Sequence, residues 1–434
     1  MDYTAEYDAR RCTAEEIAAR VRDNWRVCAD VGVSNPKAIY DALGARARTL
    51  TGVTVDSNIE MYPMPWYEDF KNFGHVTGCS WFSNAGARKA VNGGYADVMP
   101  IRYCDGAAVI RDYVEVDALC LVVSPMDKHG FFSMGASGSF GTERIRKAKH
   151  IFLEVNRFMP RSLAGPQIHV SAVTALCEHH VPLPELPAVA IDAVSQKIGE
   201  LIAERIEDGD CLQLGIGAIP NAVGFALKGK RNLGIHTEML TDSLAELLDC
   251  GAADNSRKQV RPGKSVATFA LGSRRVYDLI DDNPSVEILP SEFVNDPRVI
   301  CQNRNVVSVN SAIEVDFYGQ VCGESVGVKH ISGSGGQPDF VRGAILSENG
   351  RSFIAFSSTA ETKHGDVSRV VPVLAAGAVV TTNKNDVDMV VTEYGVAKLR
   401  GQTLSARVRN LIAVAHPQFR EQLLYTARER GVLV

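Results

Sequence analysis

The sequence contains no apolar run long enough to cross a membrane. A membrane-spanning helix needs roughly 20 consecutive apolar residues, whereas the longest stretch without a charged residue, residues 211–227, is interrupted by Gly215, Gly217 and Pro220. This stretch is instead typical of a strand, a loop and a helix. The N-terminus carries Asp2 and Glu6 where a signal or transit peptide would be basic, so we expect a cytoplasmic protein.

The sequence also lacks an excess of charge of either sign. Lys and Arg total 46 and Asp and Glu total 51, which gives a net charge of -5 over 434 residues. A chain of this charge has no general attraction for nucleic acid or for anionic membranes. We therefore expect neither of these partners, and any anionic ligand must be held by a local site.

Paired cysteine motifs are absent. The ten cysteines are scattered singly, with no Cys-x-x-Cys pair, and His179-His180 lacks spaced partners. This pattern predicts reduced thiols rather than disulfides, and no metal site.

Two common catalytic motifs are missing as well. The glycine loop at residues 330–340 does not end in Gly-Lys-Ser/Thr, so it is not a Walker loop. In the sequence beginning at Gly215, proline stands at position 220 where a dinucleotide fold needs its third glycine, which disfavours a nicotinamide enzyme.

Short Val-rich runs alternate with helical patterns along the chain, as in residues 118–123, 306–309 and 378–382. Apolar runs of this length suit strands that are buried on both faces. The pattern predicts an α/β fold with largely parallel sheets.

A proline-rich segment, residues 181–187, predicts an extended connector, because proline excludes a regular helix. It divides the chain into two predicted domains, 1–185 and 186–434. A glycine loop that leads through proline into a helix occurs in both parts, at residues 32–43 and 217–227. This echo suggests two related halves, although a chance similarity stays open.

Two segments of the second part could carry chemistry. The turn Gly215-Ile216-Gly217 lies between a predicted strand and a predicted helix, where free backbone N–H groups favour a phosphate or an oxyanion. Glu238 follows a short apolar run and could serve as a nucleophile or a base. Taken singly, each has a plainer interpretation, namely a tight turn and a helix-start carboxylate.

Two further loops are candidates for ligand contact. The loop at residues 330–340 could wrap a ligand or act as a lid, and Lys363 could pair with a phosphate. A surface loop and a solvated lysine are the simpler alternatives.

Taken together, these segments resemble the acetyl-CoA hydrolase/transferase family, which includes 4-hydroxybutyrate and butyryl-CoA:acetate CoA-transferases. The matching segments span nearly the whole chain: residues 123–130, 168–171, 215–220, 236–239, 310–316, 335–340 and 391–397. Each segment alone is weak evidence for the family, whereas the whole set in this order is specific to it.

The resemblance implies two tandem CoA-transferase-type domains, with Glu238 as the catalytic nucleophile in the second. It places coenzyme A against Gln213, Leu214, Gly215, Ile216 and Gly217, and near Ile313, Gly336 and Lys363. It implies acyl-CoA and a small carboxylate as substrates, no permanently bound cofactor and no metal. A homo-oligomer is left open.

The implied reaction moves coenzyme A between short-chain carboxylic acids through a glutamyl-CoA thioester. Acyl-CoA hydrolysis on the same scaffold is the alternative, and it differs in whether water reaches the thioester. The acyl group stays open among acetate, butyrate, 4-hydroxybutyrate and dicarboxylates such as succinate or itaconate. A dicarboxylate needs a basic partner, for which Arg88 and Arg102 are candidates.

Overall fold

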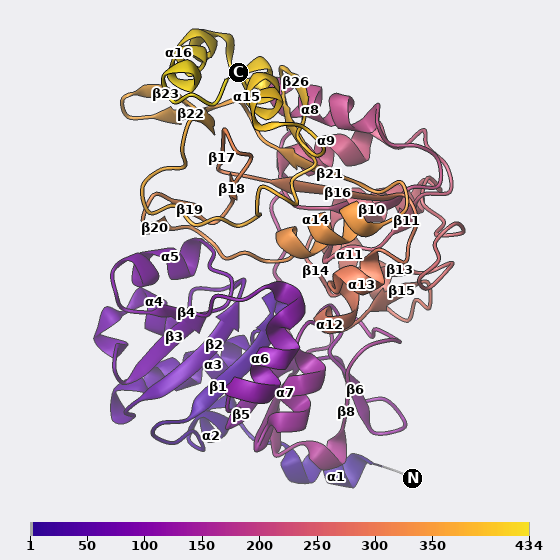
Figure 1. Cartoon of the computed structure of the whole chain (residues 1–434). Helices are drawn as coiled ribbons and strands as arrows, with labels where there is room; N and C mark the ends of the chain where they lie inside the picture. Colours follow the sequence, from indigo (N-terminus) through magenta and orange to yellow (C-terminus); the bar gives the residue numbers. More distant parts are fainter. Residues whose placement is uncertain (1–2, 434) are drawn as a thin grey trace.

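The computed structural model describes residues 3–433, and two large parallel sheets organise it (Figure 1). The first part of the chain forms the lower, indigo-to-magenta half of Figure 1, and the second part forms the upper, pink-to-yellow half. The prediction of an α/β fold with largely parallel sheets is confirmed.

The first sheet has seven strands, all parallel. Its strands, in order across the sheet, are β4 (Asp97–Val98), β3 (Val76–Ser80), β2 (Val53–Asn58), β1 (Arg26–Val31), β5 (Ala118–Val123), β7 (His150–Val155) and β9 (Ala175–Glu178). The helices of this part are α1 (Thr4–Arg10), α2 (Ala14–Ala18), α3 (Lys37–Ala45), α4 (Pro65–Glu68), α5 (Ala85–Asn92), α6 (Gly106–Tyr113) and α7 (Gly141–Lys147). Strand β5 is buried along its whole length, as its Val-rich sequence predicts.

The second sheet has six strands, and all but the last pair are parallel. Its order is β11 (Gly234–Ile235), β10 (Cys211–Leu214), β16 (Val306–Ser311), β21 (Arg351–Ala355), β25 (Met389–Thr392) and β26 (Gly395–Lys398). The helices are α8 (Ala193–Ala203), α9 (Ala218–Ala226), α10 (Asp242–Asp249), α11 (Arg274–Ile280), α12 (Ser291–Val294), α13 (Pro297–Ile300), α14 (Gln337–Leu346), α15 (Leu404–Val414) and α16 (Pro417–Glu429).

Short ladders complete the structure. They are β6 (Phe131–Ser133) with β8 (Gln167–His169), β12 (Met239–Leu240) with β14 (Phe269–Ala270), β13 (Ser265–Ala267) with β15 (Val286–Ile288), β19 (Ser325–Val326) with β20 (Lys329–His330), β22 (Thr359–Thr362) with β23 (Gly365–Ser368), and β17 (Glu314–Asp316) between β18 (Val321–Cys322) and β24 (Val370–Val371). Residues 378–382, which the sequence predicts as a buried strand, form no strand of a sheet. Val379 and Val380 are exposed there instead.

The two sheets wind in the same way. In each, the first strand lies inside the sheet, the chain moves outward on one side, and it then returns to the other side of that first strand. The glycine loops of the sequence echo follow these first strands, β1 and β10, and lead into α3 and α9. The shared order agrees with the idea of two related halves. It also places the reversal of strand order beside β10, and open α/β sheets bind ligands at such a point.

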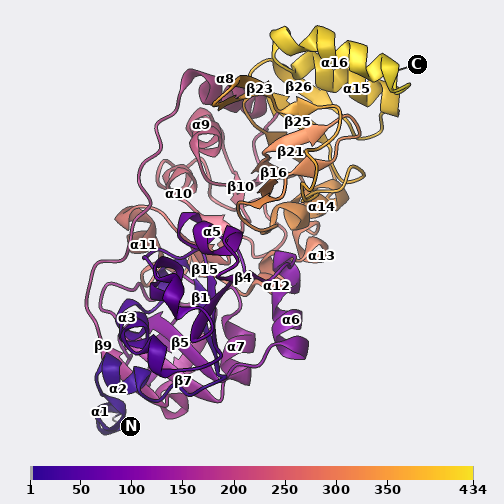
Figure 2. The ribbon, with the colours of Figure 1, turned by 90° about the vertical axis from the view of Figure 1, so that its left-hand side faces the viewer.

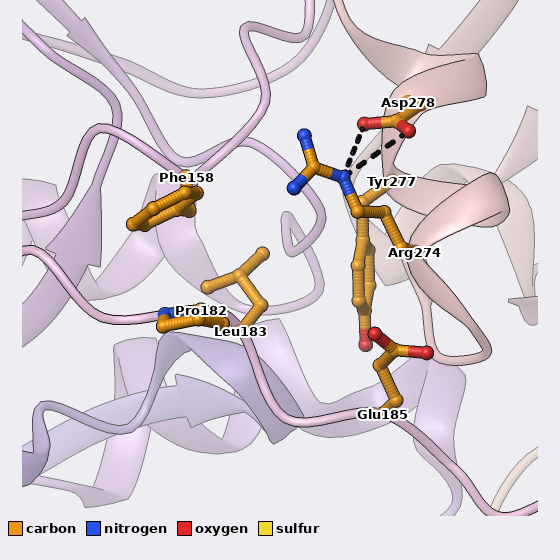
Figure 3. Close-up of a pocket in the computed structure, with 7 residues that line it drawn as sticks. All are labelled: Phe158, Pro182, Leu183, Glu185, Arg274, Tyr277 and Asp278. Atoms are coloured by element: carbon orange, nitrogen blue, oxygen red, sulfur yellow. Dashed lines mark hydrogen bonds and ion pairs between the residues drawn. The ribbon is translucent and has the colours of Figure 1, made fainter.

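The proline-rich connector runs extended down one side of the molecule between β9 and α8 (Figure 2). Its contacts with α11 surround a small hollow of about 40 Å³ (Figure 3). The hydroxyl of Tyr277 donates to the carbonyl of Pro184 at 2.7 Å, and Leu186 N–H donates to Gly272. A hollow of this size holds about one water molecule, so these contacts secure the connector rather than form a ligand site. The boundary at residues 185 and 186 stays a prediction.

No helix in residues 3–433 is both long and apolar enough to pass through a membrane.

Candidate active site

Glu238 lies at the carboxyl edge of the second sheet, between β11 and β12. Its backbone carbonyl accepts N–H bonds from Thr268 at 2.9 Å and from Phe269 at 3.2 Å. The preceding residue, Thr237, is fully buried and its hydroxyl donates to the Met239 carbonyl. These bonds fix the backbone on both sides of Glu238, so its side chain projects from a rigid position.

His236, two residues earlier, has a structural role. Its imidazole is buried, with Nε2 at 2.8 Å from the Val294 carbonyl and Nδ1 at 3.2 Å from the Asn303 amide. Burial lowers the pKa of His236 to about 3, so the ring is neutral at physiological pH. These bonds hold the backbone between the end of β11 and Glu238 in place.

One carboxylate oxygen of Glu238 is held and the other points elsewhere. Asn295 Nδ2 donates to Glu238 Oε2 at 2.7 Å. A Cβ atom at Gly336 would lie 1.9 Å from the same oxygen, so glycine is required for this close approach. Oε1 faces Gly335, whose own added Cβ would lie 3.8 Å from it and 3.0 Å from the ring of Phe82. The free oxygen thus points to the side where the first part of the chain meets the second.

The surroundings of Glu238 favour its neutral form. The side chain is half-buried, and the resulting desolvation raises the pKa of Glu238 to about 8. The Asn295 amide and the Gly336 N–H oppose the shift, while the charge of Asp339 adds to it. A carboxylate that is poorly solvated when ionised is a strong nucleophile, because the protein stabilises it less than water does.

The raised pKa predicts how pH acts on stability. A carboxyl whose pKa is higher in the folded than in the unfolded state stabilises the fold at low pH, and it loses that contribution as pH rises from about 4.5 to about 8. We therefore expect Glu238→Gln to melt several degrees above the wild type at pH 8 to 9, and at the same temperature near pH 4. Differential scanning fluorimetry across this pH range measures the difference. A variant that is no more stable than the wild type at pH 8 would contradict the raised pKa.

The predicted glycine turn follows β10, next to the strand that leads to Glu238. Strands β10 and β11 pair in parallel, with Leu212 opposite Ile235. Ile216 is exposed, and a Cβ at Gly217 would meet no atom within 4 Å, so this turn is open to a ligand. The side chains of Gln213 and Leu214 point inward instead: Gln213 Oε1 accepts from Ser308 at 2.8 Å, and Leu214 is buried in the core.

A hollow of about 350 Å³ lies on the same edge of the sheet, a size suited to a small ligand. It is lined by the ends of β16 and β21, by α8 and α9 and by Arg369, and includes Ile219, Ser311, Phe356 and Thr359. Gln337, directly after Gly336, donates to the carbonyl of Ser311 at 2.6 Å. The residue next to Gly336 therefore bonds the rim of the hollow, which places the hollow close to the contact between Gly336 and Glu238.

The structure brings only some of the predicted ligand residues together. Gly336 contacts Glu238, and the turn at residues 215–217 lies beside it. Ile313 lies two residues after Ser311, and its carbonyl accepts from Arg369 Nε at 2.8 Å. Lys363 is exposed at the tip of the β22–β23 hairpin, which begins at the hollow with Thr359. No contact joins Lys363 to Glu238 in the structure described.

Both arginines suggested for a second carboxylate are already engaged. Arg88 bonds the carbonyl of Ile331, and Arg102 forms an ion pair with Asp339 at 3.0 Å. Each arginine therefore joins the two parts of the chain, and neither stands free to bind the second carboxylate of a dicarboxylate.

Sequence reasoning missed Asn295 and Arg369. Asn295 follows α12 and has no motif around it, so only its place in the fold reveals its bond to Glu238. Asp339, in contrast, belongs to the predicted segment 335–340, although no role is assigned to it there.

Comparison with known proteins identifies the family. The acetyl-CoA hydrolase/transferase N-terminal domain matches residues 1–187, and the C-terminal domain of the same name matches residues 272–427. The succinyl-CoA:cyclohexane-1-carboxylate CoA transferase of Geobacter metallireducens is 46% identical over 426 residues, which cover 98% of this chain and 97% of that protein. The 4-hydroxybutyrate coenzyme A transferase of Clostridium kluyveri is 41% identical over 437 residues, 99% of this chain and all of that one.

A solved structure agrees with these matches. RipA from Yersinia pestis superposes with a TM-score of 0.94 at 34% identity, over the whole of both chains. The resemblance stated from the motifs and the expectation of an enzyme are both confirmed. The chain belongs to the acetyl-CoA hydrolase/transferase family.

Proposed function

We propose that this enzyme transfers coenzyme A between short-chain carboxylic acids through a thioester of coenzyme A with Glu238. The observation that carries the proposal is the position of Glu238: a desolvated carboxylate, fixed by Asn295 and Gly336, at the sheet edge beside an open glycine turn. The names of the relatives, which are CoA transferases acting on several acids, support the same reaction.

The reaction follows from the chemistry of a carboxylate nucleophile. Oε1 of Glu238 attacks the thioester carbonyl of acyl-CoA, which gives a mixed anhydride and the CoA thiolate. The thiolate then attacks the glutamyl carbonyl, so that the donor carboxylate leaves and a glutamyl-CoA thioester remains. An incoming carboxylate reverses both steps, forming the new acyl-CoA and restoring Glu238. One thioester replaces another, so the exchange is nearly balanced in free energy.

Each step passes through a tetrahedral oxyanion that needs hydrogen-bond donors. The Asn295 amide and the Gly336 N–H, which face the carboxylate in the structure, are suited to this role. Further backbone N–H groups are available in the turn at residues 215–217.

The hollow beside Ser311 is our proposed place for part of coenzyme A. Arg369 lines it but is bonded to the carbonyls of Ala312 and Ile313. The hairpin that carries exposed Lys363 starts at the rim of the hollow, so Lys363 is the cation available for a phosphate. From there the thiol end would pass Ile313 and Gln337 to reach Glu238. The backbone after Leu214, rather than the side chains of Gln213 and Leu214, would contact the ligand.

Because Arg88 and Arg102 bond groups of the protein itself, we favour monocarboxylates over dicarboxylates as acceptors. The test is a panel of acceptors, butyrate, 4-hydroxybutyrate and succinate, offered to the purified enzyme with acetyl-CoA. We expect new acyl-CoA products by chromatography, with the monocarboxylates used fastest. Free CoA released at a rate that does not depend on the acceptor would instead establish the alternative, a hydrolase.

Asn295→Ala provides a second test of the site. The bond it removes joins an amide to a charged group, and such bonds contribute about 1.5–3 kcal/mol. We expect kcat/KM to fall about 10- to 100-fold. The acidic limb of the pH profile, on which Glu238 ionises, should move to higher pH, since the amide holds the pKa of Glu238 down. Steady-state kinetics over pH 6 to 10 measures both effects, and Asn385→Ala, at an exposed position, is the control. Unchanged kinetics in Asn295→Ala would remove this residue from the site.

A further inference from the structure

Two short segments from opposite parts of the chain are fastened together beside Glu238. Cys104 N–H donates to Asp339 Oδ2 at 2.9 Å, and Arg102 Nη2 lies 3.0 Å from Asp339 Oδ1. Tyr103 N–H donates to the carbonyl of Gly335 at 3.3 Å. We call this set of contacts, residues 102–104 with residues 335–339, the Arg102–Asp339 clasp. It ties the first part of the chain to the loop that touches the nucleophile.

The clasp contains a buried carboxylate, that of Asp339. Asp339 is fully buried in the first turn of α14, whereas the Arg102 side chain is about half exposed. Gly336, at the start of the same helix, contacts Glu238. The carboxylate of Asp339 therefore stands one helical turn from the nucleophile, in surroundings that screen charge poorly.

A second negative charge beside Glu238 has a chemical consequence. It opposes the ionised carboxylate but exerts no such repulsion on a neutral ester, anhydride or thioester of the same side chain. Conversion of Glu238 into the proposed glutamyl-CoA thioester would relieve the repulsion. Arg102 acts in the opposite direction, since its positive charge offsets that of Asp339.

We propose that Asp339 and Arg102 are opposed positioning residues, in which buried Asp339 drives Glu238 toward its neutral acylated form and Arg102 limits that drive. The proposal rests on the proposed function, with Glu238 as the nucleophile. It assigns to the clasp a control over how much enzyme carries coenzyme A covalently, in addition to joining the two parts of the chain.

The other groups that face this pair respond differently to pH. Burial raises the pKa of Tyr103 and of Cys104 above their usual ranges, so both stay neutral at working pH. Asn295 and the Gly336 N–H carry no titratable charge. Burial raises the pKa of Asp339 to about 6, and the thiol and N–H of Cys104, together with Arg102, oppose that shift. Above about pH 7 the charge that acts on Glu238 is that of Asp339, and Arg102 is its ion-pair partner. Asp105 and Asp296 also face Arg102.

The test uses two substitutions that break the same clasp but change charge in opposite directions. In Asp339→Asn, we expect the midpoint of the kcat/KM pH profile, which reports the free enzyme, to move down by about one unit, the scale of a nearby charge. In Arg102→Gln it should move up. After equilibration with one acyl-CoA and its free acid at pH 7.5, intact-protein mass spectrometry should show several-fold less glutamyl-CoA adduct in Asp339→Asn than in wild type.

Matched controls separate charge from structure. Asp339→Glu keeps the charge and should keep the wild-type midpoint even where kcat falls. Asp249→Asn and Arg304→Gln make the same changes of net charge at exposed ion pairs remote from the clasp, and should not move the midpoint. Midpoints that stay in place or move in the same direction in Asp339→Asn and Arg102→Gln would show that the clasp is purely structural, and would overturn the proposal.

The proposed function has its own test, which is independent of the clasp. A Glu238→Gln variant that still transfers coenzyme A would refute the nucleophile, whatever the clasp variants do. If Glu238→Gln is inactive and the two midpoints do not separate, only the inference about the clasp is lost.

Discussion

Glu238→Gln is expected to abolish CoA transfer while leaving the fold intact. Glutamine has the shape of glutamate and can keep the bond from Asn295, but its amide is a very poor nucleophile, so no anhydride or thioester can form. Loss of a covalent nucleophile commonly lowers kcat about 10⁴-fold or more. We expect transfer from acetyl-CoA to butyrate to fall below detection in a coupled assay.

The control for this variant is Glu246→Gln. Glu246 lies on the surface, where it pairs with Lys228, and the same chemical change there should leave the rate unaltered. Binding of coenzyme A to Glu238→Gln, measured by calorimetry, should stay within a few-fold of the wild type, because the proposed CoA contacts lie elsewhere. Near-normal transfer by the variant would end the assignment of Glu238.

Gly336→Ala is expected to have the second largest effect. A methyl group there would lie 1.9 Å from Glu238 Oε2 and 2.4 Å from Asn295 Nδ2, so either the nucleophile or its amide partner must move. The backbone of Gly336 has φ of −91°, which alanine adopts without strain, so the effect is confined to the site. A displacement of about 1 Å at a reacting group can reduce the rate about 100-fold.

Gly229→Ala is the matched control for Gly336→Ala. Gly229 is exposed, and an added Cβ would meet no atom within 4 Å. We expect both variants to melt near the wild-type temperature, and only Gly336→Ala to lose activity in steady-state assays. Full activity in Gly336→Ala would mean that the glycine loop does not hold the nucleophile as the structure shows it.

The sheets could be predicted from sequence because parallel strands that are buried on both faces leave a strong pattern of apolar runs. Strands β5 and β16 follow that pattern. The run at residues 378–382 has a similar composition but forms no sheet strand, since its valines lie on the surface. Composition alone does not show which apolar run pairs with a neighbouring strand in a sheet.

The site was predictable only in part. Glu238, Gly336 and the turn at residues 215–217 carry local motifs, and the family resemblance gives these motifs a chemical meaning. Asn295 has no local signal, because its role depends on a contact across 57 positions of sequence. Arg102 illustrates the opposite error: its charge suggests a substrate partner, but the fold pairs it with Asp339, 237 positions away.

The central claim is that coenzyme A becomes covalently attached to Glu238. The most direct measurement is to mix the purified enzyme with acyl-CoA and no acceptor, digest it at mildly acidic pH, and sequence the peptide containing Glu238 by mass spectrometry. The account predicts a mass increase equal to coenzyme A less one water molecule on Glu238, absent in Glu238→Gln and removed by added carboxylate. Active enzyme that carries no adduct on this peptide under these conditions would contradict it.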